Sequence, residues 1–248
     1  MSTLEARFLG TGDAFGSGGR LHTATLLKAA DGSVLVDCGP STLALLRGQQ
    51  IDPGQVDTIL LTHLHGDHFA GVPFFLMDAH FASGRARDLC VAGPRGLEER
   101  IRRAHNVLFP GTGPLPFRFG LKFVEWEAGR RDDLGSCQVT PRLVRHAPSL
   151  PCFGLRIEFA GRVLAFSGDT EWAATLPDLA RDADLFLCEC FGCDWAPPGH
   201  LAYRTLQAHR AELTCRRLLL THMGEDMLRR VDGLDCESAR DGLVVTLE

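Results

Sequence analysis

The stretch Thr62-His63-Leu64-His65-Gly66-Asp67-His68 brings three imidazoles and one carboxylate into six consecutive positions. It follows Thr58–Leu61, an apolar segment rich in β-forming residues that is typical of a buried strand. Ligand sites in open α/β sheets lie at the carboxyl ends of strands, which is where this cluster falls. Imidazole and carboxylate together suit zinc and neighbouring first-row metals. The stretch therefore predicts a metal site at the end of a buried strand.

The spacing within this cluster favours two metal ions. Alternate residues of an extended segment project to the same side, so His63 and His65 can bind one ion. Asp67 and His68 then lie on the other side and can bind a second. A solvated polar loop is the alternative interpretation, but such a loop has no reason to hold histidine at this density. Isolated histidines elsewhere are interpreted as surface or core residues, namely His80, His105 and His209.

Two ions need more ligands than the motif provides, and the pattern of a strand followed by a polar side chain recurs three times. His146, Asp169 and His222 each follow a β-rich apolar segment. Any one of them could be a turn or strand-end residue, and an aspartate after a glycine is common in turns. Because the pattern repeats at three strand ends, we predict that all three side chains complete the metal site.

Short apolar runs alternate with helical stretches along the chain, with no linker, repeat or low-complexity segment between them. Strand hairpins mixed with strand-helix units favour an α/β fold whose sheets are covered by helices, here as a single domain over residues 1–248. The proline- and glycine-rich segment Gly111–Gly120 is interpreted as a surface loop. The predicted helices are Thr42–Arg47, Phe69–His80 and Leu201–Leu213, and the predicted strands are Ala6–Leu9, Thr23–Leu27, Ser33–Val36, Thr58–Leu61, Val139–Val144, Leu155–Phe159, Val163–Phe166, Leu185–Cys188 and Leu218–Leu220.

The overall composition is that of a soluble globular protein, with 248 residues, 45% of them hydrophobic and 23% charged. A formal net charge of -5 argues against a broad electrostatic grip on nucleic acid, yet a metal cluster can still attract a small anionic substrate. We find no secretory signal and no membrane-spanning run of roughly 18 apolar residues. The nine cysteines form no disulfide framework, so we expect reduced thiols and a cytoplasmic location.

The chain resembles the metallo-β-lactamase-fold superfamily, and within it the ribonuclease Z-like phosphodiesterase branch. The resemblance spans nearly the whole chain, and the His-rich motif is its most specific part. The segments that carry it, in the order in which that branch has them, are Phe8–Gly12, Arg20, Val36–Gly39, Asp57–Gly71, His146, Ser167–Thr170, Gly199-His200 and Thr221-His222.

This resemblance implies a four-layer αββα sandwich with the metals at one edge of the two sheets. It also implies a ligand set: His63, His65 and His146 for the first metal, Asp67, His68 and His222 for the second, with Asp169 bridging them. The expected cofactor is a pair of Zn²⁺ ions, with Mn²⁺ or Fe²⁺ as alternatives. A homodimer is a further expectation from the resemblance.

The expected mechanism is hydrolysis by a metal-bound hydroxide that attacks phosphorus or a carbonyl carbon. Asp67 would orient or deprotonate the attacking water. In the ribonuclease Z-like pattern a Gly-His pair before a helix protonates the leaving oxygen, assisted by a glutamate, and His200 and Glu189 match these positions. The alternative interpretation makes His200 a simple helix-start residue after Pro197-Pro198-Gly199.

Three departures from this pattern bear on the substrate. The tRNA-processing members carry a long basic arm between the equivalents of His146 and Asp169, whereas only residues 147–168 lie between them here. Cys188 stands where a histidine is usual, and the turn Ala147–Cys152 is reshaped. We therefore expect a small phosphodiester or nucleotide-type substrate and no tRNA or membrane partner. The alternatives are a carbonyl substrate, namely a lactone, thioester or β-lactam, and a catalytically silent metal-binding protein.

Overall fold

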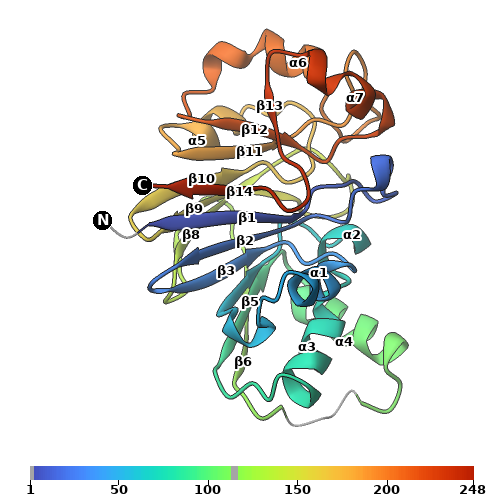
Figure 1. The fold of residues 1–248 in the computed structure, drawn as a ribbon, viewed down its shortest axis with the longest axis vertical. Helices are drawn as coiled ribbons and strands as arrows, with labels where there is room; N and C mark the ends of the chain where they lie inside the picture. The colour runs from blue at the N-terminus through green and yellow to red at the C-terminus, as the bar shows by residue number, and fades with distance from the viewer. Residues whose placement is uncertain (1–2, 113–116) are drawn as a thin grey trace.

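Two mixed β-sheets packed face to face form the centre of the computed structural model, which describes residues 3–112 and 117–248 (Figure 1). Among these residues each sheet has seven strands. The first sheet runs in the order β14 (Val244–Leu247), β1 (Leu4–Gly10), β2 (Ala24–Ala29), β3 (Gly32–Val36), β4 (Thr58–Leu60), β5 (Leu89–Gly93) and β6 (Leu121–Glu125). The second runs β13 (Glu237–Ser238), β12 (Leu218–Thr221), β11 (Leu185–Glu189), β10 (Arg162–Phe166), β9 (Phe153–Phe159), β8 (Gln138–Leu143) and β7 (Asp132–Asp133).

The two sheets share one topology. In the first, β1, β2 and β3 are antiparallel neighbours, whereas β3, β4, β5 and β6 run parallel. In the second, β8, β9 and β10 are antiparallel neighbours, whereas β10, β11, β12 and β13 run parallel. Parallel strands end at the same edge of a sheet, so each sheet collects several strand ends at one edge.

Apolar side chains fill three layers between the sheets and the helices. In β3, Val34 and Val36 face the core between the two sheets, while Leu35 faces the opposite core under the helices. This alternation of buried residues on both faces is what a sheet covered on both sides requires. Burying a leucine or valine side chain contributes roughly 1.5–3 kcal/mol, so each buried residue of these three cores stabilises the fold.

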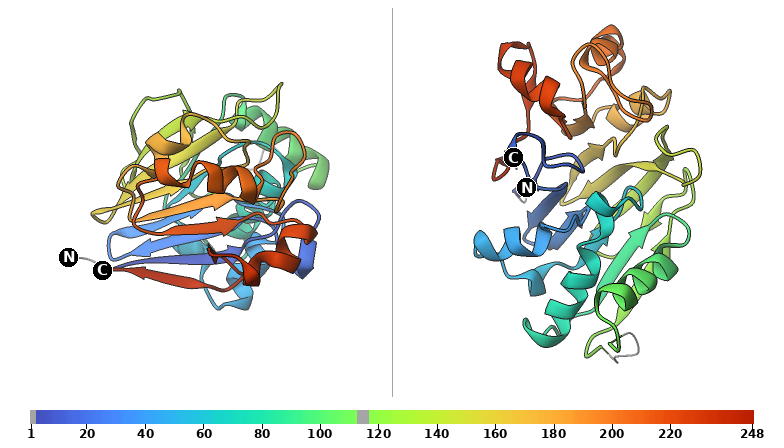
Figure 2. Two further views of the ribbon diagram at one scale, coloured as in Figure 1. Left: turned by 90° about the horizontal axis from the view of Figure 1, so that it is seen from above. Right: turned by 90° about the vertical axis from the view of Figure 1, so that its right-hand side faces the viewer.

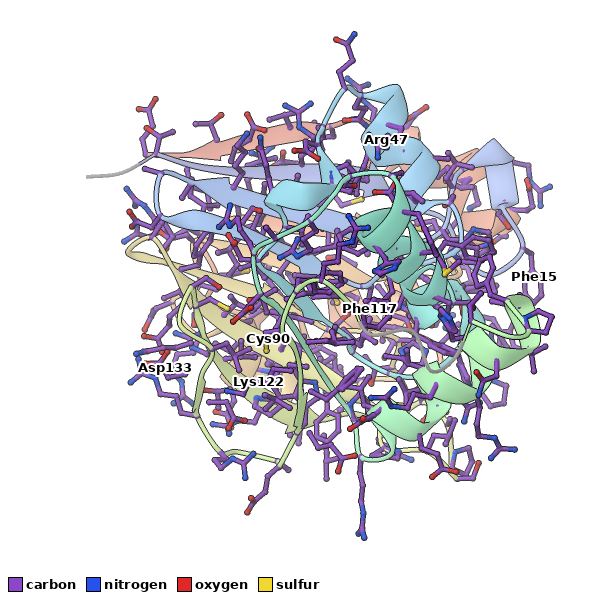
Figure 3. All side chains as sticks on the ribbon, turned by 90° about the horizontal axis from the view of Figure 1, so that it is seen from below. Phe15, Arg47, Cys90, Phe117, Lys122 and Asp133 are labelled. Atoms are coloured by element: carbon purple, nitrogen blue, oxygen red, sulfur yellow. The ribbon has the colours of Figure 1, made fainter. Side chains whose placement is uncertain are left out.

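Helices cover the outer face of each sheet, as the two views of Figure 2 show. The first sheet carries α1 (Thr42–Gly48), α3 (Val72–Phe81) and α4 (Leu97–Leu108), and the second carries α5 (Leu176–Ala180), α6 (Tyr203–Ala208) and α7 (Glu225–Arg230). Figure 3 shows Arg47 on the outer side of α1, where its guanidinium pairs with Asp78 of α3 at 2.6 Å. The predicted four-layer αββα sandwich is confirmed.

Two predicted helices are wrong in their bounds. The segment Phe69–His80 is divided between the short helix α2 (Gly66–Phe69) and α3, because the chain turns at Gly71. A Cβ at Gly71 would lie 2.2 Å from the carbonyl oxygen of Gly39, so the backbone there packs too closely for a side chain. The predicted helix Leu201–Leu213 is shorter, since α6 ends at Ala208 and only a 3-10 turn follows it.

Several elements escape prediction from the sequence, namely the helices α4, α5 and α7 and the strands β5, β6, β7, β13 and β14. The predicted loop Gly111–Gly120 lies partly outside the described residues, since 113–116 are not among them. All nine cysteines are free thiols, and Cys188, Cys190 and Cys193 are buried. Within the described ranges no helix has the length and apolar character needed to cross a bilayer.

Candidate metal centre

The polar side chains predicted to form the site follow strands of both sheets. His63 lies just beyond β4, His146 just beyond β8, Asp169 beyond β10, and His222 directly after β12. Helix α2, which carries Asp67 and His68, lies on the side of the molecule away from the two chain termini (Figure 1). The backbone N–H of Phe153 donates to the carbonyl of Thr62 at 3.0 Å, which ties the two sheets together at this edge.

His63, His65 and His146 form the first group of candidate ligands, with ligand atoms within 4.8 Å of one another. Nε2 of His146 lies 2.9 Å from Nδ1 of His65. Burial lowers the pKa of each of these three imidazoles below its usual value, and the neighbouring imidazoles lower it further. The group is therefore neutral near pH 7, which is the form in which histidine binds metals.

Asp67, His68, Asp169 and His222 form the second group, also within 4.8 Å and all buried. Nε2 of His68 and Nε2 of His222 lie 3.3 Å and 3.4 Å from Oδ2 of Asp67. Burial opposes protonation of His222, but Asp169 and Asp67 outweigh it and raise its pKa to about 9. This group therefore concentrates negative charge that a cation would neutralise.

Asp169 lies between the two groups. Its Oδ2 is 3.8 Å from Nε2 of His63 and 3.7 Å from Nε2 of His146 on one side, and 3.3 Å from Nε2 of His222 on the other. Burial alone would raise the pKa of Asp169, but His222 and His68 hold it well below its usual value. Gly168, with φ of +60°, makes the turn that directs this carboxylate into the cluster.

The donor set fits divalent metal ions. Among the described residues, Nε2 of His63 and Nε2 of His68 are buried and have no hydrogen-bond partner. An unpartnered buried nitrogen is costly unless something else satisfies it, and both nitrogens face the cluster of carboxylates and imidazoles. Nitrogen and oxygen donors of this kind suit zinc, manganese and iron. The seven predicted ligand residues are thus brought together, in the two groups expected, around a place suited to cations.

Asp37 supports this site and was not singled out from the sequence. It accepts a hydrogen bond from Nδ1 of His68 at 2.7 Å and another from the backbone N–H of Thr62 at 2.9 Å. Its φ of +57° is unusual for a residue other than glycine, a form of backbone strain that concentrates at functional sites. The available signal was its position directly after β3, the same strand-then-acid pattern that pointed to Asp169.

A loop before α6 supports the site from the second sheet. The carbonyl of Gly199 accepts a hydrogen bond from Nδ1 of His146 at 2.8 Å, which leaves Nε2 of that imidazole facing His65. Gly199 has φ of +87°, and a Cβ there would lie 2.8 Å from the carbonyl oxygen of His146. Only glycine fits this approach without displacing a candidate ligand.

His200 and Glu189 form a pair beside the cluster. Nδ1 of His200 donates to Oε1 of the buried Glu189 at 3.1 Å, and Oε2 accepts from the backbone N–H of Leu201 at 3.0 Å. Burial opposes the protonated form of His200, but Glu189 outweighs it and raises the pKa of His200. The His200 ring lies 4.8 Å from that of His146 and 5.5 Å from that of His222. Helix α6 begins later, at Tyr203, so His200 does not cap it.

Comparison with known proteins identifies the family to which this chain belongs. Residues 33–223 match the family described as the beta-lactamase superfamily domain, and the chain belongs to that family. Over 204 residues, 80% of this chain and 70% of the relative, it is 33% identical to the uncharacterized protein ML1173 of Mycobacterium leprae (strain TN). It is also 33% identical to ribonuclease BN of Escherichia coli over 178 residues, which are 70% of this chain but only 56% of that enzyme.

Solved structures have the same fold. The metallo-β-lactamase fold protein YhfI of Bacillus subtilis superposes with a TM-score of 0.80 at 19% identity over all of both chains. The short form of human tRNase Z superposes with 0.78 at 23% identity over 97% of this chain and 98% of that chain, and a diphosphatase of the PhnP family with 0.78 at 18% identity over 99% and 98%. The resemblance to the metallo-β-lactamase-fold superfamily is confirmed, and that superfamily includes hydrolases, among them the ribonuclease and the diphosphatase named above.

Proposed function

We propose that the protein is a dinuclear metal-dependent phosphodiesterase that hydrolyses a small phosphodiester of the nucleotide type. The observation that carries this proposal is the His200–Glu189 pair, held at 3.1 Å beside both ligand groups. An alkoxide leaving group needs a proton, and a histidine whose pKa is raised by a buried carboxylate is suited to supply one.

The seven grouped side chains are the proposed ligands of two Zn²⁺ ions, with Mn²⁺ or Fe²⁺ as alternatives. His63, His65 and His146 would hold the first ion, Asp67, His68 and His222 the second, and Asp169 would bridge them. When bound, such ions lower the pKa of water and stabilise charge on a phosphoryl group. Asp37 and the Gly199 carbonyl would keep His68 and His146 oriented, as partners of metal-bound histidines do.

Two side chains of the protein, Asp67 and His200, would act on the attacking water and on the leaving group, respectively. Asp67, whose pKa His68 and His222 hold below its usual range despite burial, is a permanent carboxylate that would orient the attacking water. His200 would donate the proton of its other ring nitrogen to the leaving oxygen, while Glu189 holds Nδ1. The carboxylate also keeps the imidazolium stable between turnovers.

A small substrate is supported by the connection between β8 and β10. Residues 147–168 hold only a turn and the hairpin of β9 and β10, so no protruding arm leaves the sandwich there. The net charge of -5 also disfavours non-specific attraction to RNA. The named activities of ribonuclease BN, tRNase Z and the PhnP-family diphosphatase all concern phosphoryl chemistry, which supports a phosphorus substrate over a carbonyl one.

A substrate panel with a chelator tests the proposal. Metal-loaded protein is assayed on bis-p-nitrophenyl phosphate, on a lactone and on a thioester, each with and without EDTA. We expect hydrolysis of the phosphodiester that EDTA abolishes and added Zn²⁺ restores. Faster hydrolysis of the lactone or thioester, with no turnover of the phosphodiester, would instead assign the same site to a carbonyl substrate.

A further inference from the structure

A surface pocket of about 460 Å³ is lined in part by Leu64 of the His-rich motif. Three arginines line it, Arg95 just before α4 and Arg100 and Arg103 on that helix. The pocket is also lined by Leu64 and Leu150. Leu64 lies in a loop that follows a strand of the first sheet, and Leu150 lies in a loop that follows a strand of the second sheet. We refer to this pocket as the arginine pocket.

No candidate ligand lines the arginine pocket, but two of its lining residues lie in the loops that carry candidate ligands. Leu64 stands between the candidate ligands His63 and His65, and Leu150 belongs to the turn that follows His146. The guanidinium of Arg100 lies over the ring of Phe69, 5.8 Å from its centroid. Phe69, which also lines the pocket, directly follows the candidate ligand His68 in the chain.

The arginine pocket carries a surplus of positive charge. Glu99 is the one carboxylate in its lining, and it lies 3.6 Å from Arg103 in an exposed pair that contributes little. Among the residues that the structure describes, neither Arg95 nor Arg100 has a carboxylate partner. Both side chains are exposed to solvent. Guanidinium groups bind phosphate through paired hydrogen bonds, so three of them around one hollow suit a phosphate group.

His200 lines a different pocket, which indicates where the leaving group of a substrate would lie. That pocket, of about 440 Å³, is lined by Trp172, Trp195 and Pro198 among others, and shares no lining residue with the arginine pocket. The leaving oxygen must be near His200 if this histidine protonates it. A group in the arginine pocket therefore belongs to the other arm of the phosphodiester.

We propose that the arginine pocket binds a second phosphate of the substrate, carried on the arm that keeps the cleaved phosphoryl group. The proposal rests on the phosphodiesterase function proposed above and narrows its substrate class. The reaction would add water across the P–O bond next to His200, release an alcohol that takes the proton, and leave a product with two phosphate monoesters.

A matched pair of substrates tests this assignment. Thymidine 5′-(p-nitrophenyl phosphate) and its 3′-phosphorylated form have the same leaving group and differ only in the second phosphate. We expect the 3′-phosphate to lower KM by about tenfold, the effect of one good charge-assisted contact, with little change in kcat. Equal KM values for the two substrates in the unaltered protein would overturn the proposal.

Variants of α4 provide the matched controls. Arg100→Ala and Arg103→Ala should each remove most of the KM advantage of the 3′-phosphate. Arg102→Ala removes the same charge from the same helix, but Arg102 pairs with Glu98 and lies over Phe123, outside the arginine pocket. It should keep the full advantage. An equal loss in all three variants would mean a general charge effect and would contradict a specific pocket.

A binding measurement separates this proposal from the proposed catalysis. Calorimetry on the metal-loaded protein compares thymidine 3′,5′-bisphosphate with thymidine 5′-monophosphate, neither of which is a phosphodiester. We expect the bisphosphate to bind more tightly, and Arg100→Ala to weaken it about tenfold whether or not either ester is hydrolysed. Arginine-dependent binding of the bisphosphate by a protein that hydrolyses no phosphodiester would refute the catalytic proposal alone. No preference for the bisphosphate would refute the pocket, even in an active phosphodiesterase.

Discussion

The carboxylate of Asp37 accepts the Nδ1 hydrogen of His68 at 2.7 Å, and this contact decides which nitrogen of His68 faces the candidate metal centre. With Nδ1 held by Asp37, Nε2 is directed into the cluster, where it lies 3.3 Å from both Asp67 and Asp169. Thr62 holds the other oxygen of Asp37 through its backbone N–H. A residue outside the predicted ligand set therefore orients the imidazole of one inside it.

Replacing Asp37 should weaken the second metal site. In Asp37→Asn one oxygen stays with Thr62 and an amide donor then faces Nδ1 of His68, so the imidazole loses its acceptor. We expect about a 10–100-fold loss of affinity for one of two ions, measured by titration against a competing chelator. Asp57→Asn, a change at the opposite end of β4, is the control for general destabilisation. Unchanged affinity for both ions would leave Asp37 with a structural role only.

The purified protein should bind two metal ions per chain. Seven nitrogen and oxygen donors converge, whereas a single catalytic zinc needs three protein ligands and a water. Elemental analysis after dialysis against Zn²⁺ measures the ratio directly, and removal by EDTA should abolish activity. A ratio of one ion or fewer at saturation would contradict the assignment of two sites.

Asp169→Ala should abolish activity and loosen both metals. Its carboxylate lies 3.3–3.8 Å from imidazoles of both groups, and two cations held close together repel each other unless a negative charge lies between them. Metal content and turnover are measured together, with the exposed Asp178→Ala as control. If the Asp169 variant kept both metals and full turnover, this residue would be only a turn residue.

His200→Ala should leave metal binding intact and slow hydrolysis by roughly 10²–10⁴-fold on an ester with an alkoxide leaving group. A p-nitrophenolate leaving group scarcely needs a proton, so the same variant should lose little on a p-nitrophenyl ester. Kinetics on such a pair, with metal analysis of the variant, make the test. Equal losses on both esters would assign His200 to substrate binding, and lost metal would make it a ligand.

The variant Glu189→Gln tests whether Glu189 keeps His200 protonated. The buried carboxylate raises the pKa of His200 against the effect of burial, so its neutralisation should lower that pKa. The rate on the alkoxide ester depends on protonated His200, so its decline at alkaline pH should move to lower pH in the variant. Glutamine can still accept from Nδ1 of His200, which limits the structural change. A profile identical to that of the unaltered protein would contradict this pairing.

Precursor tRNA should be a poor substrate. The connection across residues 147–168 offers no arm for the tRNA body, and a net charge of -5 gives no general attraction to RNA. Trimming of a 3′ trailer is measured at moderate salt, with a small phosphodiester as positive control. Efficient trimming would show that another surface binds tRNA and would overturn the small-substrate proposal.

Local patterns in the chain were sufficient for the fold class and for part of the site. His63 and His65 are two residues apart after a buried strand, and Asp67 and His68 follow at once, so no long-range folding is needed to bring them together. The strands that face two apolar layers, such as Gly32–Val36, are readable because both faces are buried. Short strands such as β13 and the amphipathic helix α4 depend on packing and left weaker signals.

Tertiary structure decided which distant residues meet. His146 lies 2.9 Å from His65 although 81 positions separate them, and Asp37 reaches His68 across 31 positions. The order of strands within each sheet and the packing of one sheet on the other create these contacts. Local propensity does not encode either of them, since both arise from burying apolar faces across long loops. The sequence by itself determined the kinds of ligand and the strand ends that carry them. Only the folded sandwich decided that Asp37 orients His68 and that arginines of α4 share a pocket with Leu64 of the His-rich motif.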